Sequence, residues 1–288
     1  MAESLSGVFA LLIFVTVALT ALSIGLVTTV DLLRSALGQR RVVTLVLLNC
    51  AVVPLAGYLI SGAVPLSPGA RTGIVICAIC AGGPLALKAT QIAKGDLTWS
   101  LSMTVVLLVL NVVTLPLWSA LLIDGSVALR PADLVGVLGA AILIPVGLGM
   151  AIRPRISGVD RWFKLLTLAS NVLLVLAIAV GLVASSEGLI AGLSSWLAPV
   201  VLAVLLVAGG AGWAIRDQRD RKRASTISTL NRATSVALLI VGRVFPDQIE
   251  IFTAVVLFGL VQTVIAVGLA LYWGVAASRP AAAAPVAG

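Results

Sequence analysis

Two positively charged side chains lie inside stretches of the chain that are otherwise apolar. Lys88 and Arg232 are each followed by the same dipeptide, Ala89-Thr90 and Ala233-Thr234. A charge near the middle of a bilayer costs roughly 2.5–3.5 kcal/mol on insertion scales, so such residues are retained mostly where they serve a substrate or ion path. We therefore interpret the two motifs as the two halves of one binding site.

The composition indicates what surrounds these cations. Of the 288 residues, 60% are hydrophobic and 10% are charged, whereas soluble globular chains carry roughly 25% charged residues. We therefore expect a multi-pass protein of the lipid bilayer. The net charge of +8 does not indicate a nucleic-acid partner, because the basic residues lie in short loops between apolar runs, which is the pattern that orients membrane proteins.

Nine apolar stretches are long enough to cross a membrane. Their approximate bounds are 6–30, 42–62, 71–93, 97–122, 134–152, 165–184, 197–215, 225–243 and 250–276. Apart from the two cations within stretches, most of the 19 Lys and Arg lie on one side, and the other side has only Arg71, Arg130 and Arg243. This asymmetry predicts an inner (plasma) membrane protein with its N-terminus outside and its C-terminus in the cytoplasm. Residues 277–288 are predicted to be a disordered cytoplasmic tail.

The two cationic motifs occur in matching contexts. Each lies in a stretch that is followed by a short turn and then by another apolar stretch, and the two stretches run in opposite directions across the membrane. This arrangement is typical of inverted-repeat transporters. We expect a first repeat in residues 1–122 and a second in residues 123–276.

A helix break is predicted at Gly82, Gly83 and Pro84, in the middle of the third stretch. Proline removes a hydrogen-bond donor, and the two glycines loosen the turn. In lipid, a break is tolerated only where it is buried or lines a cavity. The eighth stretch has no Gly or Pro at its centre, but its hydroxyl and amide side chains can serve as partners for backbone groups there.

From Gly82-Gly83-Pro84 to Lys94-Gly95-Asp96 the chain resembles the bile acid:sodium symporter family of secondary transporters. Ser100 and Thr104 fit the polar helix that follows in that family, and the resemblance covers roughly residues 15–275. It implies an all-α membrane fold of about nine transmembrane helices, with a panel domain and a core domain. Within the core, it implies two discontinuous helices that cross.

The chain departs from the family pattern where the resemblance places sodium. The family's Ser-Asn pair falls on Ala86 and Leu87, and its Glu-x-x-x-Gln-Asn falls on Thr226, Leu230 and Asn231. None of the eleven acidic residues lies in mid-membrane. A sodium site without a carboxylate, flanked by two cations, is disfavoured. We therefore expect sodium to be an unlikely partner and the two cations to stand in for two sodium ions.

The polar residues of these stretches form one candidate site. The predicted substrate-binding or crossing-site residues are Lys88, Arg232, Asn231, Thr90, Thr234, Ser100, Thr104, Asn49, Thr226 and Ser228. Asn49 occupies the position of a family glutamine on the second core helix. No catalytic residue, cofactor or metal is expected.

The predicted function is alternating-access transport of a small organic anion, a carboxylate, without sodium. One alternative is a sodium-coupled anion symporter with an atypical site built from Ser100, Thr104, Asn231 and backbone carbonyls. Another is a substrate sensor that binds without transport. An intramembrane enzyme is not expected, because the chain has no His and only a Ser–Lys pair could be catalytic.

Overall fold

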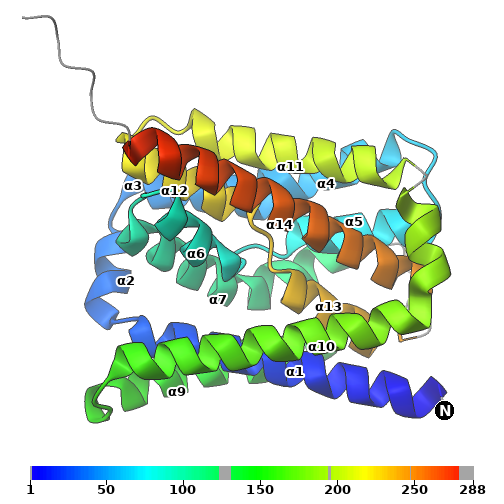
Figure 1. Cartoon of the computed structure of the whole chain (residues 1–288), viewed down its shortest axis with the longest axis horizontal. Coiled ribbons are helices and arrows are strands. Elements are labelled where there is room, and N and C mark those ends of the chain that lie inside the picture. Colours follow the sequence, from blue (N-terminus) through cyan, green and yellow to red (C-terminus); the bar gives the residue numbers. More distant parts are fainter. Residues whose placement is uncertain (1, 123–130, 194–195, 247, 279–288) are drawn as a thin grey trace, which may run out of the picture.

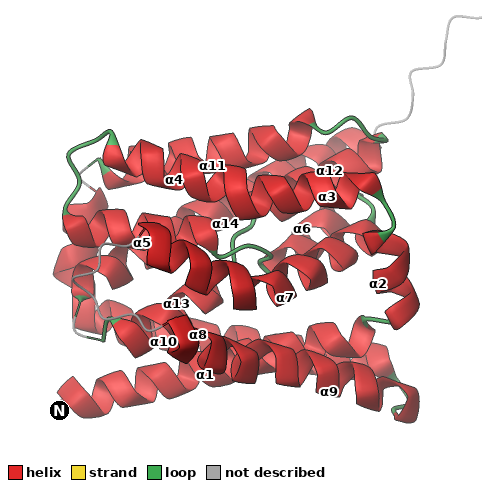
Figure 2. Cartoon of the chain, turned by 180° about the vertical axis from the view of Figure 1, so that it is seen from behind, coloured by secondary structure: helices red, strands yellow, loops and turns green. Residues whose placement is uncertain are grey.

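The computed structural model describes residues 2–122, 131–193, 196–246 and 248–278, and these residues form helices joined by turns and loops (Figure 2). The predicted tail from residue 279 onward lies outside the described residues. The helical elements follow one another in this order: α1 (Ala2–Val27), α2 (Val30–Leu37), α3 (Arg40–Leu47), η1 (Leu48–Val52), α4 (Val53–Gly62), α5 (Pro68–Ile79), α6 (Leu85–Ile92), α7 (Leu97–Leu122), α8 (Pro131–Leu138), η2 (Gly139–Leu143), α9 (Ile144–Ile152), η3 (Arg153–Arg155), α10 (Val159–Leu193), α11 (Leu197–Ala214), α12 (Arg219–Leu230), α13 (Thr234–Val244) and α14 (Ile249–Ser278).

Eight helical segments of the described chain are long and apolar enough to cross a membrane, judged by length and composition. The predicted stretch 71–93 is not among them, because it is divided into α5, with 12 residues, and α6, with 8 residues. With this broken pair, the helices account for about nine crossings, as predicted. The connections between them gather at two opposite ends of the molecule (Figure 1).

The helices form two layers, which correspond to the predicted panel and core (Figures 1 and 2). The panel contains α1, α8, α9 and α10, and the core contains α3 to α7 and α11 to α14. Glycines bring the panel helices close together. A Cβ on Gly25 would lie 2.3 Å from the carbonyl oxygen of Val146, and a Cβ on Gly149 would lie 2.6 Å from that of Leu22. Small residues of this kind allow membrane helices to pack backbone against backbone.

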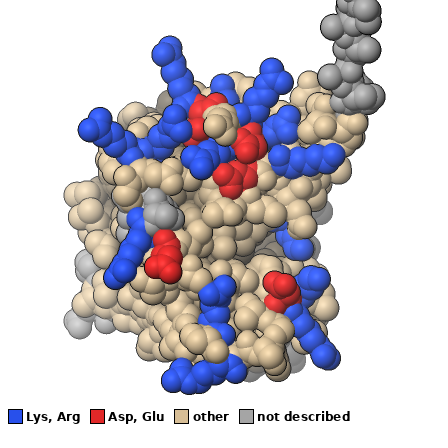
Figure 3. All heavy atoms as spheres, turned by 90° about the vertical axis from the view of Figure 1, so that its left-hand side faces the viewer, with Lys and Arg blue, Asp and Glu red and all other residues tan. Residues whose placement is uncertain are grey.

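One end of the molecule is rich in basic side chains. Figure 3 looks onto this end, where many Lys and Arg surround a few Asp and Glu. It is the end opposite the N-terminus of α1 (Figure 1). The loops that gather here are those for which the sequence predicted a cytoplasmic position.

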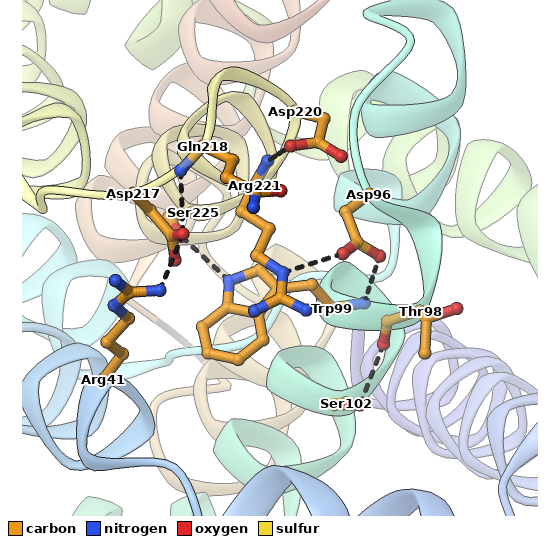
Figure 4. Close-up of polar contacts among 10 residues, drawn as sticks. All are labelled: Arg41, Asp96, Thr98, Trp99, Ser102, Asp217, Gln218, Asp220, Arg221 and Ser225. Atoms are coloured by element: carbon orange, nitrogen blue, oxygen red, sulfur yellow. Dashed lines mark hydrogen bonds and ion pairs between the residues drawn. The ribbon is translucent and has the colours of Figure 1, made fainter.

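At this end, Asp96, the last residue of the Lys94-Gly95-Asp96 turn between α6 and α7, contacts Arg221 of α12 (Figure 4). Asp96 Oδ1 accepts a hydrogen bond from the Trp99 backbone N–H at 2.9 Å and so caps the start of α7. Asp96 Oδ2 forms an ion pair with Arg221 Nε at 3.1 Å. Trp99 Nε1 donates to Ser225 Oγ at 2.9 Å. The turn that carried part of the family resemblance therefore holds core helices together.

Replacing Arg221 with glutamine should lower the free energy of unfolding only slightly. The two side chains of this ion pair are 35% and 21% exposed, and such pairs contribute at most about 1 kcal/mol. Asp96→Ala should destabilise the protein more, because the cap is also lost, at a cost of typically about 1 kcal/mol. Thermal unfolding in detergent at low and high salt would test this. Equal losses in the two variants would contradict the assignment of the cap to Asp96.

Candidate functional site at the crossing of the broken helices

The chain leaves the helical conformation between α5 and α6 and again between α12 and α13, and the two breaks lie against each other. The Ala233 backbone N–H donates to the carbonyl of Cys80 at 2.8 Å, and the Gly83 N–H donates to the carbonyl of Asn231 at 3.1 Å. The crossing of two discontinuous helices is therefore confirmed. The second break has no Gly or Pro, and these bonds supply partners for its Asn231 carbonyl and its Ala233 N–H.

The glycines of the first break are required by the close approach of the second. A Cβ on Gly83 would lie 2.5 Å from the carbonyl oxygen of Arg232 and 2.8 Å from Asn231 Oδ1. Gly82 has a φ of +76°, which side chains other than glycine rarely adopt. The helix break predicted at Gly82, Gly83 and Pro84 is thus confirmed, because α5 ends at Ile79 and α6 begins at Leu85.

Each break is held by an amide side chain from the helix that follows. From α7, Asn111 Oδ1 accepts from the Ala81 N–H at 3.0 Å and Nδ2 donates to the Ala81 carbonyl at 2.7 Å. From α14, Gln262 Oε1 accepts from the Arg232 N–H at 2.8 Å and Nε2 donates to the Arg232 carbonyl at 3.0 Å. We call these pairs of bonds the two amide clamps. Neither residue is among the predicted site residues, although both are amides in the middle of a span.

Arg232 lies in the second break and its side chain is only 1% exposed. Nη1 donates to Asn49 Oδ1 at 2.8 Å, and Nη2 donates to the Asn49 carbonyl at 3.2 Å. Nη2 also donates to the Ala78 carbonyl, and Nε donates to the Cys77 carbonyl at 3.5 Å. The guanidinium is therefore bound by four oxygen atoms of the protein. Within the described residues, none of its hydrogen-bond partners is a carboxylate.

The carbonyl partners are available because helices end or are interrupted beside Arg232. Cys77 and Ala78 belong to the last turn of α5, where carbonyls lack helical donors and the helix dipole favours a cation. The Asn49 carbonyl is free for another reason. In the π turn η1, Val53 N–H bonds the carbonyl of Leu48, and Pro54 has no N–H to offer Asn49. Such π turns occur frequently at functional sites.

Asn49 is itself fixed in the orientation that Arg232 needs. Its Nδ2 donates to the Leu45 carbonyl at 2.9 Å and to Thr229 Oγ1 at 3.2 Å. The side-chain oxygen is therefore directed to the guanidinium. Asn49 was predicted as a site residue, and the structure places it in direct contact with Arg232, whereas Thr229 was not predicted.

Lys88 does not join Arg232, which corrects the prediction of one site with two cations. Lys88 is exposed, and the described structure gives it no hydrogen bond or ion pair. The buried face of α6 is formed instead by Ala86, Ala89 and Thr90. The amide clamps show why the sequence match misled. The counterpart of Arg232 in the first break is Ala81, so the shared Ala-Thr dipeptides do not mark equivalent positions.

The predicted hydroxyl residues fall into two groups. Thr90 donates to Ser100 Oγ at 3.1 Å, and Ser100 Oγ lies 3.4 Å from Ser228 Oγ, so α6, α7 and α12 share a buried hydroxyl cluster. Thr104 and Thr226 instead donate to carbonyls one turn earlier in their own helices. The hydroxyl of Thr226, at the position of the family carboxylate, thus bonds within its own helix, to the Lys222 carbonyl.

Asn231 contains a buried donor without a partner. Its Oδ1 accepts from Gln262 Nε2 at 3.2 Å, but its Nδ2 has no hydrogen-bond partner in the described structure. Gln262 Nε2 also approaches Thr234 Oγ1, at 3.5 Å, so the predicted Thr234 contacts the same clamp. An unsatisfied buried donor costs about 1–3 kcal/mol. The crossing therefore carries one positive charge and one free donor.

A family model matches residues 12–192, and its description is Sodium Bile acid symporter family. The chain belongs to this family. Human Sodium/bile acid cotransporter 4 is 27% identical over 251 residues, which are 82% of this chain and 57% of the relative. The probable sodium/metabolite cotransporter BASS1 of rice chloroplasts is 29% identical over 145 residues, which are 50% of this chain and 36% of the relative.

This member of the sodium bile acid symporter family thus spans little more than half the length of the human relative that it matches. The ileal sodium/bile acid cotransporter of Cricetulus griseus is 26% identical over 141 residues, which are 45% of this chain and 39% of the relative. The names of these relatives describe cotransporters. The second broken pair, which contains Arg232, lies beyond the part of the chain that the family model matches.

Proposed function

We propose that the protein is a secondary transporter of small organic anions that works without sodium. Arg232 would supply, from within the chain, the positive charge that the family resemblance assigns to sodium ions near the crossing. The observation that supports this proposal is the set of four oxygen atoms around the buried guanidinium. The proposal gives Arg232 the role that the sequence analysis assigned to two cations.

Oxygen atoms in this arrangement are ligands that a hard cation also prefers. A sodium ion could not share them with the guanidinium. Two unit charges 4 Å apart repel by about 4 kcal/mol at an effective dielectric constant of 20. An additional sodium ion near Arg232 would therefore need a carboxylate to offset the repulsion, and Thr226 occupies the position where the family has one.

The fixed charge also suggests the substrate class. No carboxylate of the described chain bonds to the guanidinium, so a substrate anion would complete the charge balance of the crossing. The free Nδ2 donor of Asn231 suits a carboxylate oxygen. Lys88 keeps a part in the proposal as an exposed cation of α6 that would attract an approaching anion. The hydroxyl cluster of Thr90, Ser100 and Ser228 would line the path.

Transport would proceed by movement of the core against the panel. We propose that residues 1–122 and 123–276 are inverted repeats, because the amide clamps of α7 and α14 act on equivalent breaks. We also propose that the basic end in Figure 3 faces the cytoplasm of a plasma membrane. The panel and core meet near the opposite end, where the rings of Phe9 and Phe252 pack edge to face at 5.4 Å. This end would be the closed one.

A disulfide between Ala10→Cys and Gly242→Cys should stop transport. A Cβ on Gly242 would lie 3.7 Å from the Cα of Ala10, so α13 of the core and α1 of the panel are close enough to be joined. Flux into proteoliposomes should be lost on oxidation and recover on reduction. Each of the two substitutions alone, in the chain that keeps its native Cys50, Cys77 and Cys80, is the control. Undiminished flux in the crosslinked protein would contradict movement of the core against the panel at this end.

The proposal is tested by thermal unfolding of the purified protein with acetate, pyruvate, benzoate and cholate, each as its sodium and its choline salt. A ligand at 100 times its dissociation constant stabilises by about 2.7 kcal/mol. We expect one anion class to stabilise the protein equally in both salts and to show flux in sodium-free proteoliposomes. Stabilisation that requires sodium would instead support a sodium-coupled symporter, the function that the relatives' names favour. Binding without flux would support a sensor.

A further inference from the structure

We propose that Gln262 is a positioning residue that makes Asn231 a hydrogen-bond donor to the substrate rather than a ligand for a cation. The inference rests on the proposed function and goes beyond it, because it assigns the polarity of the site to a residue of α14 that need not touch the substrate. Three amide groups lie in series at the crossing, the Arg232 backbone and the side chains of Gln262 and Asn231, and each fixes the orientation of the next.

The backbone of Arg232 fixes the amide of Gln262. The Arg232 N–H needs an acceptor and finds Gln262 Oε1 at 2.8 Å, and the Arg232 carbonyl needs a donor and finds Gln262 Nε2 at 3.0 Å. Exchanging the oxygen and nitrogen of Gln262 would place donor against donor and acceptor against acceptor. Only one orientation of this side chain therefore satisfies the buried backbone.

The amide of Gln262 in turn fixes that of Asn231. Gln262 Nε2 donates to Asn231 Oδ1 at 3.2 Å. The opposite orientation of Asn231 would place its NH₂ group against the NH₂ group of Gln262. The oxygen also packs against the first break, 2.8 Å from where a Cβ on Gly83 would lie. Asn231 Nδ2 is consequently the group left free, and it is buried without a partner.

This orientation decides what the site can bind. An amide coordinates a metal cation through its oxygen, and Asn231 Oδ1 faces Gln262 and Gly83 of the first break, so the oxygen is not presented to a ligand that approaches from the Nδ2 side. The free NH₂ group can only donate, so it selects a ligand with an acceptor atom, such as a carboxylate. The other clamp has no such consequence, because Asn111 acts on Ala81, whose side chain is a methyl group. Asn111 is therefore a matched control within the same fold.

Gln262→Glu should reverse the polarity of Asn231. A carboxylate at position 262 can accept from the Arg232 N–H but has no donor for the Arg232 carbonyl or for Asn231 Oδ1. Asn231 would therefore turn, donate to the carboxylate and present its oxygen. We expect the melting temperature of this variant to rise by several degrees in sodium chloride relative to choline chloride. Neither the wild type nor Asn111→Asp, which adds a carboxylate at the other clamp, should show this rise.

Asn231→Asp provides a second test that leaves the clamp intact, because it replaces the free NH₂ with an oxygen. It should gain the same sodium response, and if Gln262→Glu does not fold it still tests whether the free position of Asn231 is the one that faces a ligand. A response to sodium in Asn111→Asp as large as in Gln262→Glu would overturn the proposal, as would the absence of a response in Asn231→Asp. These measurements contain no organic anion. Failure of the anion panel would therefore refute the proposed function without deciding the role of Gln262.

Discussion

Replacing Arg232 with alanine should lower the free energy of unfolding by roughly 4 kcal/mol. The substitution would leave the carbonyls of Cys77, Ala78 and Asn49, together with Asn49 Oδ1, buried without a donor. Each unsatisfied group costs about 1–3 kcal/mol. The sum is reduced because burial of the charge is no longer required. Thermal unfolding of the purified variant in detergent would measure the loss.

Arg232→Ala should also become sensitive to sodium. The space left by the guanidinium would be lined by oxygen atoms, and sodium chloride should raise the melting temperature above the value in choline chloride. Arg232→Lys retains the charge but has a single ammonium for four acceptors, so it should be intermediate in stability and insensitive to sodium. If Arg232→Ala were unstable yet equally so in both salts, the guanidinium would be a structural group and not a substitute for sodium.

Gly83→Ala should be the other severe substitution, with a loss of more than about 3 kcal/mol. The added Cβ would lie 2.5 Å from the Arg232 carbonyl oxygen and 2.8 Å from Asn231 Oδ1. Neither atom can move away freely, because Gln262 donates to both. The two breaks would have to separate, and the backbone bond from Gly83 to Asn231 would be lost.

Gly268→Ala in α14 is the matched control, because a Cβ there would meet nothing within 4 Å. An alanine in place of an unconstrained helical glycine stabilises by about 0.4–1 kcal/mol. The two Gly→Ala changes should therefore have opposite signs in the same unfolding assay. A Gly83→Ala protein as stable as the wild type would mean that the breaks are not in contact in the membrane.

Some of this site could be predicted from local chemistry. The burial of Arg232 followed from its place in the middle of a span, and the first break followed from Gly82, Gly83 and Pro84. The second break could not be predicted in this way, because Asn231, which begins it, is neither Gly nor Pro. Its conformation depends on hydrogen bonds to Cys80 and to a glutamine in another helix.

The hydrogen-bond partners of Arg232 could not be predicted from the sequence for the same reason. The acceptor carbonyl of Asn49 exists because a π turn and Pro54 occur together, and no residue pattern marks an extra residue in a helical turn. The error over Lys88 has a different origin. A shared Ala-Thr dipeptide is too short to set the register between two repeats, and the helix periodicity that buries Ala86, Ala89 and Thr90 left Lys88 outside.

The covalent attachment of the guanidinium has an electrical consequence. Under the proposed function, Arg232 stays with the core in every conformation, so its charge makes no net crossing in a full cycle. Uptake of a monocarboxylate would carry one negative charge inward and would register as an outward current. A relative that moved two sodium ions with the same anion would give an inward current. The sign of the current recorded on a solid-supported membrane thus reports whether the cation at the crossing belongs to the protein or to the solution.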